Sequence, residues 1–322
     1  MSGAARVLAV CGGVGGAKLA EGLLRTLAPD ALAVVVNTGD DFEHLGLRIS
    51  PDVDTVLYTL AGLANPATGW GRRDETWTFM QALGALGGPT WFRLGDGDLA
   101  THVERTRRLA AGEALGAIVA DFAQRLGIAA RVLPMTDGRL ATRVDTDEGT
   151  LDFQDYFVHR QCRPRVRAIR FDGAAACRPA PALAALLAAG APEAVLICPS
   201  NPYLSIDPIL AVAGLRALLR AAGAPVVAVS PLIAGAAVKG PTAKIMDELG
   251  LRADAAEVAR HYAGLIDGFV LDRRDEALAA QIDVPVCITD TLMRSADDRR
   301  RLAAETLRFA RELAGRGERV PR

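Results

Sequence analysis

The sequence predicts an α/β protein with a Rossmann-like parallel-sheet core, helices on both faces, and a smaller inserted β-rich/α lobe. Short apolar runs typical of buried strands alternate with stretches of helical spacing, as in a parallel sheet covered by helices. Several of these runs end abruptly in glycine or polar residues, which is typical of strand ends that bind ligands. A β-rich middle interrupts the alternation, so we assign residues 1–130 and 181–322 to the core and 131–180 to the inserted lobe.

Composition limits the class of function. The chain has 322 residues, half of them apolar, and a formal net charge of -1, which gives no electrostatic argument for binding nucleic acid or an anionic membrane. No run of about 18 apolar residues is present, so we expect no membrane span. The five cysteines are scattered without metal-ligand spacing, which indicates reduced thiols and a cytoplasmic protein.

The first unit consists of a strand at residues 6–11, a glycine turn at 12–16 and a helix at 17–27. This layout is typical of a phosphate site, because free N–H groups and the positive end of the helix dipole face the turn. The turn does not match either of two common nucleotide-binding motifs, the P-loop and the dinucleotide motif. A P-loop needs a hydroxyl where Leu19 stands, and the dinucleotide spacing GxGxxG fails at Val14 or at Lys18. An anion site and a tight β–α turn without a ligand both stay open, and the four glycines favour the anion.

Four carboxylates follow the second strand, at residues 32–37. Asp40 and Asp41 stand in the turn after it, and Asp52 and Asp54 begin a helix predicted over 52–63. Ser50 or Asp52 fits as the cap of this helix, whereas Asp54 lies further in, which favours a functional role. From residue types alone, these carboxylates hold a metal, a substrate or only their own turn.

Two tryptophans and an arginine lie in the next segment. Trp70 and Trp77 belong to a Gly- and Pro-rich loop that acts either as an aromatic lid or as a surface turn anchored in the core. A helix over 75–86 precedes a predicted strand over 90–94, where Arg93 is a candidate anion ligand.

The helix that follows begins near residue 100 and runs to about 111. Asp98 fits as its cap, and His102 fits better as a structural histidine than as a catalytic one.

The remaining elements comprise the lobe and the second half of the core. A helix over 113–127 leads to lobe strands at 131–133, 140–144 and 150–153, with a hairpin turn at 137–138. The core resumes with a helix at 182–189 and a strand at 194–198, which ends in Ser200 and Asn201. Further strands are predicted at 226–229, 268–271 and 284–288, and a closing helix at 295–313. Lys239, in a later loop, is a weak candidate for a phosphate contact.

The collected motifs resemble the 2-phospho-L-lactate transferase family of coenzyme F420 biosynthesis. The similar segments run in order through nearly the whole chain. They are GGVGGAK at 12–18, VVNTGDD at 35–41, SPDVDTVLY at 50–58, GWGRRDETW at 69–77, RLGDGDLATH at 93–102 and PSNPYLSIDPIL at 199–210. One departure is Gly97, where the family often has arginine.

The resemblance implies a Mg²⁺-dependent transfer. A phospho-hydroxyacid group moves from a guanosine diphosphate adduct to the terminal ribityl hydroxyl of the deazaflavin Fo, and GMP leaves. The carried acid (phospholactate, phosphoenolpyruvate or 3-phosphoglycerate) is not specified. The resemblance also implies a homodimer without nucleic-acid or membrane partners.

The residue roles follow from combining this resemblance with the chemistry of the side chains. We expect Asp40 and Asp54 to be catalytic and to hold Mg²⁺, with Asp41 as a near alternative, because that ion prefers one or two carboxylates. Asp54 and Arg93 are expected to contact Fo, and Trp70 or Trp77 to face its ring. The nucleotide and its phosphates are expected to bind Gly12, Gly13, Val14, Gly15, Ser200 and Asn201.

Two other classes of protein remain. A non-enzymatic nucleotide-binding or regulatory protein would need the glycine turn but not Asp40, Asp54 and Arg93 together. An NAD(P) oxidoreductase is disfavoured by the failed glycine spacing.

Overall fold

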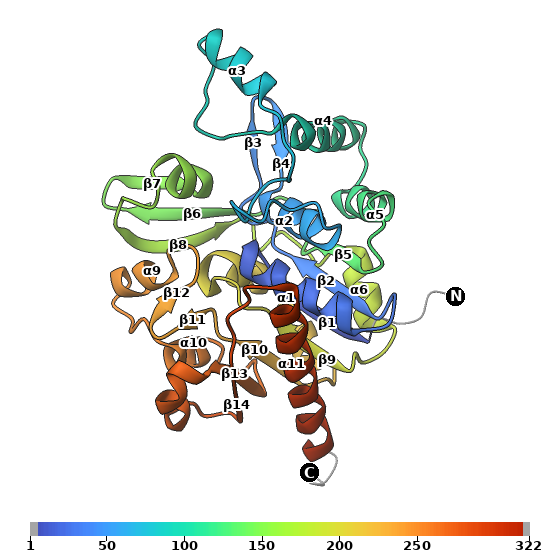
Figure 1. Ribbon diagram of the computed structural model, residues 1–322, viewed down its shortest axis with the longest axis vertical. Helices are drawn as coiled ribbons and strands as arrows, with labels where there is room; N and C mark the ends of the chain where they lie inside the picture. The colour runs from blue at the N-terminus through green and yellow to red at the C-terminus, as the bar shows by residue number, and fades with distance from the viewer. Residues whose placement is uncertain (1–5, 318–322) are drawn as a thin grey trace.

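A seven-stranded, wholly parallel sheet forms the centre of the computed structural model, which describes residues 6–317 (Figure 1). The strand order is β14-β13-β10-β9-β1-β2-β5. Their bounds are β1 (Val7–Cys11), β2 (Leu32–Val36), β5 (Arg131–Pro134), β9 (Ala194–Ile197), β10 (Val226–Val229), β13 (Gly268–Asp272) and β14 (Val286–Thr289). The predicted α/β sheet is confirmed.

Helices cover both faces of this sheet. Along β1, Val7 and Ala9 face one hydrophobic cluster while Leu8 and Val10 face the other, as the two-residue repeat of a strand requires. The first cluster is covered by α1 (Gly13–Thr26), α2 (Pro51–Leu60), α5 (Leu115–Arg125) and α11 (Ala296–Gly317). The second is covered by α6 (Pro181–Ala188), α7 (Asp207–Ala211), α8 (Leu215–Ala221), α9 (Thr242–Glu248) and α10 (Ala255–His261). Since both faces are buried, the strands are continuous apolar runs.

The strand order reverses between β1 and β9. From β1 the chain builds β2 and β5 on one side, and later β9, β10, β13 and β14 on the other. Loops that leave two such strands diverge and open a crevice at their carboxyl ends. The glycine turn follows β1, and the turn η2 (Pro202–Ile206) follows β9. The fold therefore places both segments at one crevice.

Two smaller units stand beside the sheet. The hairpin lobe, at the top of Figure 1, consists of β3 (Phe42–His44), β4 (Leu47–Ile49), α3 (Thr78–Ala85) and α4 (Asp96–Ala110). The inserted sheet consists of β6 (Ala141–Thr146), β7 (Gly149–Asp152) and β8 (Val166–Asp172), with the turn η1 (Asp155–His159). The remaining elements are β11 (Leu232–Ile233), β12 (Ala236–Ala237) and η3 (Arg273–Gln281).

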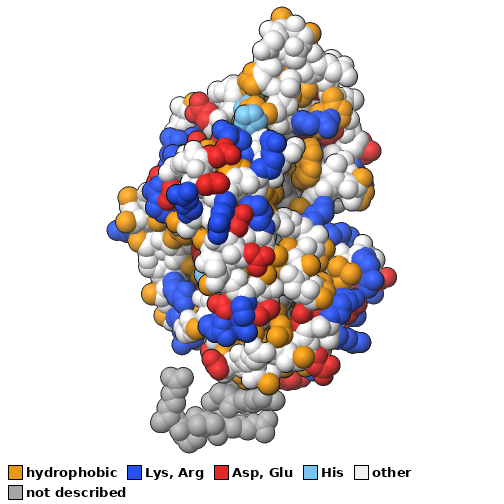
Figure 2. All heavy atoms as spheres, turned by 90° about the vertical axis from the view of Figure 1, so that its left-hand side faces the viewer, with side chains coloured by type: hydrophobic (Ala, Val, Ile, Leu, Met, Phe, Trp, Pro, Cys, Tyr) orange, Lys and Arg blue, Asp and Glu red, His pale blue; other side chains and the backbone are white. Residues whose placement is uncertain are grey.

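Paired charges cover the side of the molecule that carries the inserted sheet. Figure 2 shows that side, with basic and acidic side chains interspersed. Arg170 pairs with Asp145 at 2.8 Å, and Arg143 pairs with both Asp152 and Asp172. Exposed pairs of this kind contribute about 0.2–1 kcal/mol each. This face is therefore a solvated surface of balanced charge.

No helix within residues 6–317 is long and apolar enough to cross a bilayer.

Three predictions about local structure are wrong. Residues 131–133, assigned to the inserted lobe, belong to β5, which pairs with β2 at the edge of the central sheet. The turn at 137–138 joins β5 to β6, and the hairpin of the inserted sheet closes instead between β6 and β7.

Residues 90–94 form no strand. Their aromatic side chains pack on the β3–β4 hairpin rather than into a sheet: Phe92 lies edge-on to Phe42, with ring centroids 4.8 Å apart. An apolar run forms a β-strand only where a neighbouring strand is available for pairing, and at this point the chain has left the central sheet.

Candidate active site

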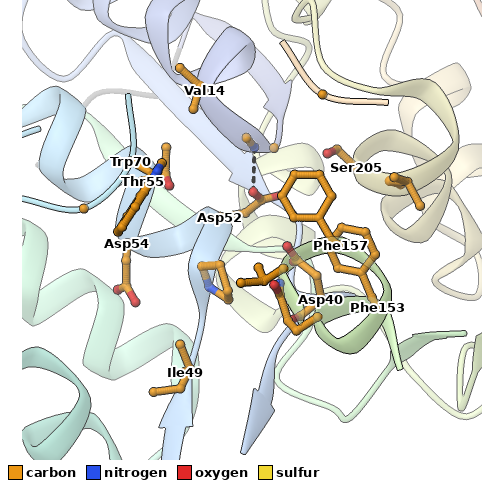
Figure 3. Close-up of a pocket in the computed structure, with 18 of the residues that line it drawn as sticks. Val14, Asp40, Ile49, Asp52, Asp54, Thr55, Trp70, Phe153, Phe157 and Ser205 are labelled. Carbon is orange, nitrogen blue, oxygen red and sulfur yellow. Dashed lines mark hydrogen bonds between the residues drawn. The ribbon is translucent and has the colours of Figure 1, made fainter. Parts of the chain in front are cut away.

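A cavity of about 600 Å³ opens at the β1–β9 crevice (Figure 3). Its floor is the glycine turn and the acidic segment around Asp40 and Asp52. One wall comes from α2 and the hairpin lobe and includes Asp54 and Arg93. The facing wall comes from the inserted sheet. In the view of Figure 3, Asp54 and Trp70 lie on one side, and Asp40, Phe153 and Phe157 on the other.

The glycine turn is already partly occupied by the protein's own side chains. Gly12 N–H donates to Ser200 Oγ at 3.1 Å, and Gly13 N–H donates to Asp52 Oδ1 at 2.7 Å. The N–H groups of Val14 and Gly15 lie in the first turn of α1, where no carbonyl of the helix reaches them. Of the four predicted phosphate donors, Val14 and Gly15 are thus the pair left for a ligand.

Close packing explains why glycine is needed here. A Cβ on Gly15 would stand 2.3 Å from the Pro199 carbonyl oxygen, and Gly13 has a φ of 62°, which favours glycine. The loop after β9 presses directly on the start of α1. Glycine at these positions is required by the fold itself, whether or not an anion binds.

Asp40 and Asp52 form a buried acidic pair linked by Asn37. The Asn37 amide nitrogen donates to Asp40 Oδ1 at 2.9 Å and to Asp52 Oδ2 at 3.0 Å. Burial, followed by the charges of Asp52 and Asp41, raises the pKa of Asp40 well above its usual value. Burial also raises the pKa of Asp52 to about 6, against hydrogen bonds from Asn37 and Gly13 that lower it. A bound cation would relieve this repulsion.

Of the two caps predicted for α2, Ser50 is confirmed and Asp52 is wrong. Ser50 occupies the N-cap position of α2, and the Asp52 carboxylate points across to the start of α1. Its real partner is 39 positions away along the chain, which sequence spacing does not indicate. Asn37 was also missed, although it ends an apolar strand, where a polar amide is a recognisable signal.

Asp41 lies outside the main cavity. It lines a separate small cavity of about 80 Å³, where Ser50 Oγ donates to its Oδ2 at 2.7 Å. Burial raises the pKa of Asp41 to about 8, which the hydrogen bond from Ser50 only partly opposes. Asp41 is therefore a poorer candidate than Asp40 for contact with substrate.

Asp41→Asn is expected to stabilise the metal-free protein at alkaline pH. Because the folded pKa is raised above the unfolded value of about 3.9, the native Asp41 contributes stability that is present at acid pH and lost as pH rises toward about 8. Asparagine does not titrate and still accepts from Ser50. Thermal unfolding in EDTA should show the variant's advantage growing between pH 5 and pH 8.5. An advantage that is the same at both pH values contradicts the raised pKa.

Asp54 belongs to a second polar cluster, on the other wall. Both of its oxygens accept from the Arg105 guanidinium, and His102 Nδ1 lies 3.6 Å from Asp54 Oδ2. His102 Nε2 lies 3.2 Å from Asp98 Oδ2, so the histidine stands between two carboxylates. Arg105 was missed by sequence reasoning because it is one of many arginines on predicted helices.

Oxygen and nitrogen atoms of Asp54, Asp98 and His102 all lie within 4.8 Å of one another, which is a spacing that could surround a cation. Asp40 is not part of this group. The predicted metal ligands Asp40 and Asp54 both line the cavity but belong to different clusters. Their shared role in holding Mg²⁺ stays a prediction.

Aromatic side chains form much of the cavity wall. Trp91 and Phe92 come from the hairpin lobe, and Phe153 and Phe157 stack with ring centroids 5.3 Å apart beside η1. Trp70 is 46% exposed and lines the cavity. No sequence signal pointed to Phe153 and Phe157, because nothing in the sequence says where an inserted sheet will pack.

Trp77 does not reach the cavity. Its ring lies under the Arg93 guanidinium, whose carbon is 4.1 Å from the ring centroid. Arg93 itself lines the cavity, so Trp77 supports a cavity residue from behind. Of the two tryptophans, Trp70 is therefore the one that faces the cavity.

Ser200 and Asn201 have structural partners. Ser200 Oγ accepts from Gly12 N–H and donates to Gly12 carbonyl oxygen at 2.8 Å, and Ser200 is not on the cavity wall. Asn201 Oδ1 caps η2 by accepting from the N–H groups of Tyr203 and Leu204. Asn201 lines the cavity and keeps a buried amide nitrogen without a protein partner, which is consistent with a ligand contact. Lys239 lines the cavity and donates to the Thr68 carbonyl at 2.7 Å.

Comparison with known proteins shows similarity along nearly the whole chain. The family model of 2-phospho-L-lactate transferase CofD matches residues 7–306. A phosphoenolpyruvate transferase of Streptomyces griseus is 40% identical over 96% of this chain and 99% of its own. A 2-phospho-L-lactate transferase of Methanopyrus kandleri is 42% identical over the same shares.

A solved structure shares the fold. It is a UPF0052 family member from Bacillus halodurans, with a TM-score of 0.58 and 15% identity over 94% of this chain and 98% of that one. The chain therefore belongs to the 2-phospho-L-lactate transferase CofD family and is a transferase of coenzyme F420 biosynthesis.

Proposed function

We propose that this transferase moves a phospho-hydroxyacid group from a guanosine diphosphate adduct to the terminal ribityl hydroxyl of Fo. The hydroxyl oxygen loses its proton to solvent and bonds to the phosphorus that bears the acid, the bond from that phosphorus to the GMP oxygen breaks, and GMP leaves with the electron pair of that bond. Such reactions are accelerated mainly by positioning the reactants and neutralising charge. The chain's residues must therefore bind the two substrates side by side and neutralise the charge of the phosphates.

The observation that carries the proposal is the meeting of three features in one cavity. Free N–H groups of Val14 and Gly15 suit a diphosphate, and the aromatic walls suit a flat ring. Asp40, Asp54 and Arg93, which come from separate segments, all line the same space. A protein that only binds a nucleotide has no need of this third group.

The donor set on the cavity floor fits Mg²⁺. Asp40 and Asp52 share the side-chain amide of Asn37, Asp52 also accepts from the Gly13 N–H, and among the salt bridges of residues 6–317 neither carboxylate has a basic partner. We propose that Asp40 holds the ion with Asp52 beside it, and that Asp54, whose oxygens already accept from Arg105, borders the site from the acceptor side. When bound, Mg²⁺ neutralises charge on the phosphate oxygens.

Incubation of the purified protein with Mg²⁺, Fo and an equimolar mixture of three guanylylated donors is expected to give one deazaflavin phosphodiester and an equal amount of GMP. The donors carry phospholactate, phosphoenolpyruvate or 3-phosphoglycerate. Mass spectrometry of the product identifies the acid, and a reaction without Fo is the control. Absence of any phosphodiester from all three donors would overturn the proposal.

A further inference from the structure

A polar ring joins α2 to α4 in one wall of the cavity, and of its members only Arg105 lies behind that wall. Asp54 and Tyr58 stand one turn apart on α2, and Asp98, His102 and Arg105 share one face of α4 at spacings of four and three residues. The two sets of side chains contact each other at both ends. Tyr58 and Asp98 close one end, and Asp54 and Arg105 close the other.

Arg105 holds Asp54 from the side away from the cavity. Its side chain is fully buried and is not on the cavity wall, whereas Asp54 is. Nη1 donates to Asp54 Oδ2 at 3.0 Å, and Nη2 donates to Asp54 Oδ1. A guanidinium that bonds both oxygens of a carboxylate fixes the rotation of that carboxylate as well as its position.

The rest of the ring holds Arg105 and His102 in place. His102 Nδ1 lies 3.3 Å from Arg105 Nη1, and His102 Nε2 lies 3.2 Å from Asp98 Oδ2. Tyr58 OH donates to Asp98 Oδ1 at 2.7 Å. Each group that touches Asp54 is thus itself held by a neighbour, which is how a rigid site is built.

An alternative role for the ring is a second cation site, because Asp54, Asp98 and His102 lie close together. Arg105 already supplies a positive charge to Asp54, and Tyr58 OH donates to Asp98 Oδ1. The geometry favours an orienting role over a metal-binding one.

We propose that Arg105 is a positioning residue for the transfer reaction, acting by holding the Asp54 carboxylate at one orientation in the cavity. The inference rests on the proposed function in one respect, namely that Asp54 meets the acceptor hydroxyl. A misplacement of about 1 Å at a reacting group lowers turnover roughly a hundredfold. Release of Asp54 by loss of Arg105 therefore lowers kcat and leaves binding of the donor, on the opposite part of the cavity, nearly unchanged.

The test compares Arg105→Met and Arg105→Lys with Arg107→Ala, an exposed arginine on the same helix that pairs with Glu104. For Arg105→Met we expect kcat to fall about a hundredfold with donor KM within threefold. Millimolar guanidinium is expected to restore part of that activity, since it can re-enter the vacated space. Arg107→Ala should match the parent in every measurement, and thermal unfolding is recorded for all of them.

Arg105→Lys covers the case in which Arg105→Met does not fold. Lysine keeps the charge, but one ammonium cannot donate to both oxygens in the guanidinium geometry. We expect lower kcat with an unfolding temperature close to that of the parent. Parental kcat in Arg105→Lys, or activity loss in Arg105→Met that matches the unfolded fraction and does not respond to guanidinium, would overturn the inference.

Failure of the proposed function has a different signature, because then the parent protein itself makes no phosphodiester. In that case crystal structures of the parent and Arg105→Lys still decide the inference. A changed or disordered Asp54 carboxylate in the variant supports it, and an unchanged one refutes it.

Discussion

Asp54→Asn is expected to lower kcat roughly a hundredfold or more. Asparagine has nearly the same shape but lacks the charge that, in the proposed reaction, faces the acceptor hydroxyl. It also exchanges one oxygen that accepts from Arg105 for an amide that cannot. GMP release at saturating donor and Fo measures this directly. Turnover within threefold of the parent would remove Asp54 from the mechanism.

Asp54→Asn is also expected to lower the free energy of unfolding, although the two side chains have nearly the same shape. Arg105 is fully buried, and removing one partner of a buried ion pair destabilises a protein by about 3–5 kcal/mol. The double variant Asp54→Asn/Arg105→Met removes both charges and should regain much of the lost stability without regaining turnover. Parallel urea unfolding and kinetics of the parent and all three variants separate the two effects. Recovery of turnover in the double variant would show that the single variant had merely unfolded.

Gly15→Ala is expected to destabilise the protein by about 1–3 kcal/mol and to raise donor KM. The added methyl would lie 2.3 Å from the Pro199 carbonyl oxygen, so either α1 or the loop after β9 must move. Movement of α1 shifts the Val14 and Gly15 N–H groups that we assign to the diphosphate. Urea unfolding and donor kinetics measure the two consequences.

Gly84→Ala is the matched control. Gly84 also lies in a helix, and its added methyl would meet Thr90 at an ordinary 3.4 Å. Alanine is a better helix former than glycine, so this variant should be as stable as the parent or slightly more so. If both alanine variants behave alike, close packing at Gly15 is not what requires glycine there.

Most of the sheet could be predicted from the sequence because strands such as β2 carry the signal locally, whereas the edge strand β5 was assigned to the inserted lobe. Residues 32–36 are buried along their entire length, and an apolar run of that kind has few other uses in a protein with α/β rhythm. The glycine turn and the carboxylates after β2 can also be recognised in the sequence, because each interrupts an apolar run. Their place at one crevice follows from the general behaviour of parallel sheets.

The parts that could not be predicted depend on contacts between distant segments. Asp52 has the spacing of a helix cap and becomes a partner of Gly13 only because α1 and α2 lie side by side. Residues 90–94 resemble a short strand in sequence but find aromatic partners on a hairpin instead. Arg105 has no distinguishing neighbours in sequence. Its importance arises from burial against Asp54, 51 positions earlier.

The division of labour between main chain and side chains in the cavity bears on how such a protein diversifies. The phosphate contacts that we assign to Val14 and Gly15 are backbone N–H groups, which no substitution can remove except proline. The walls, in contrast, are side chains on two appended units, the hairpin lobe and the inserted sheet. Selection can therefore reshape the pocket for a different acid by exchanging wall residues, while recognition of the common nucleotide portion is inherited unchanged.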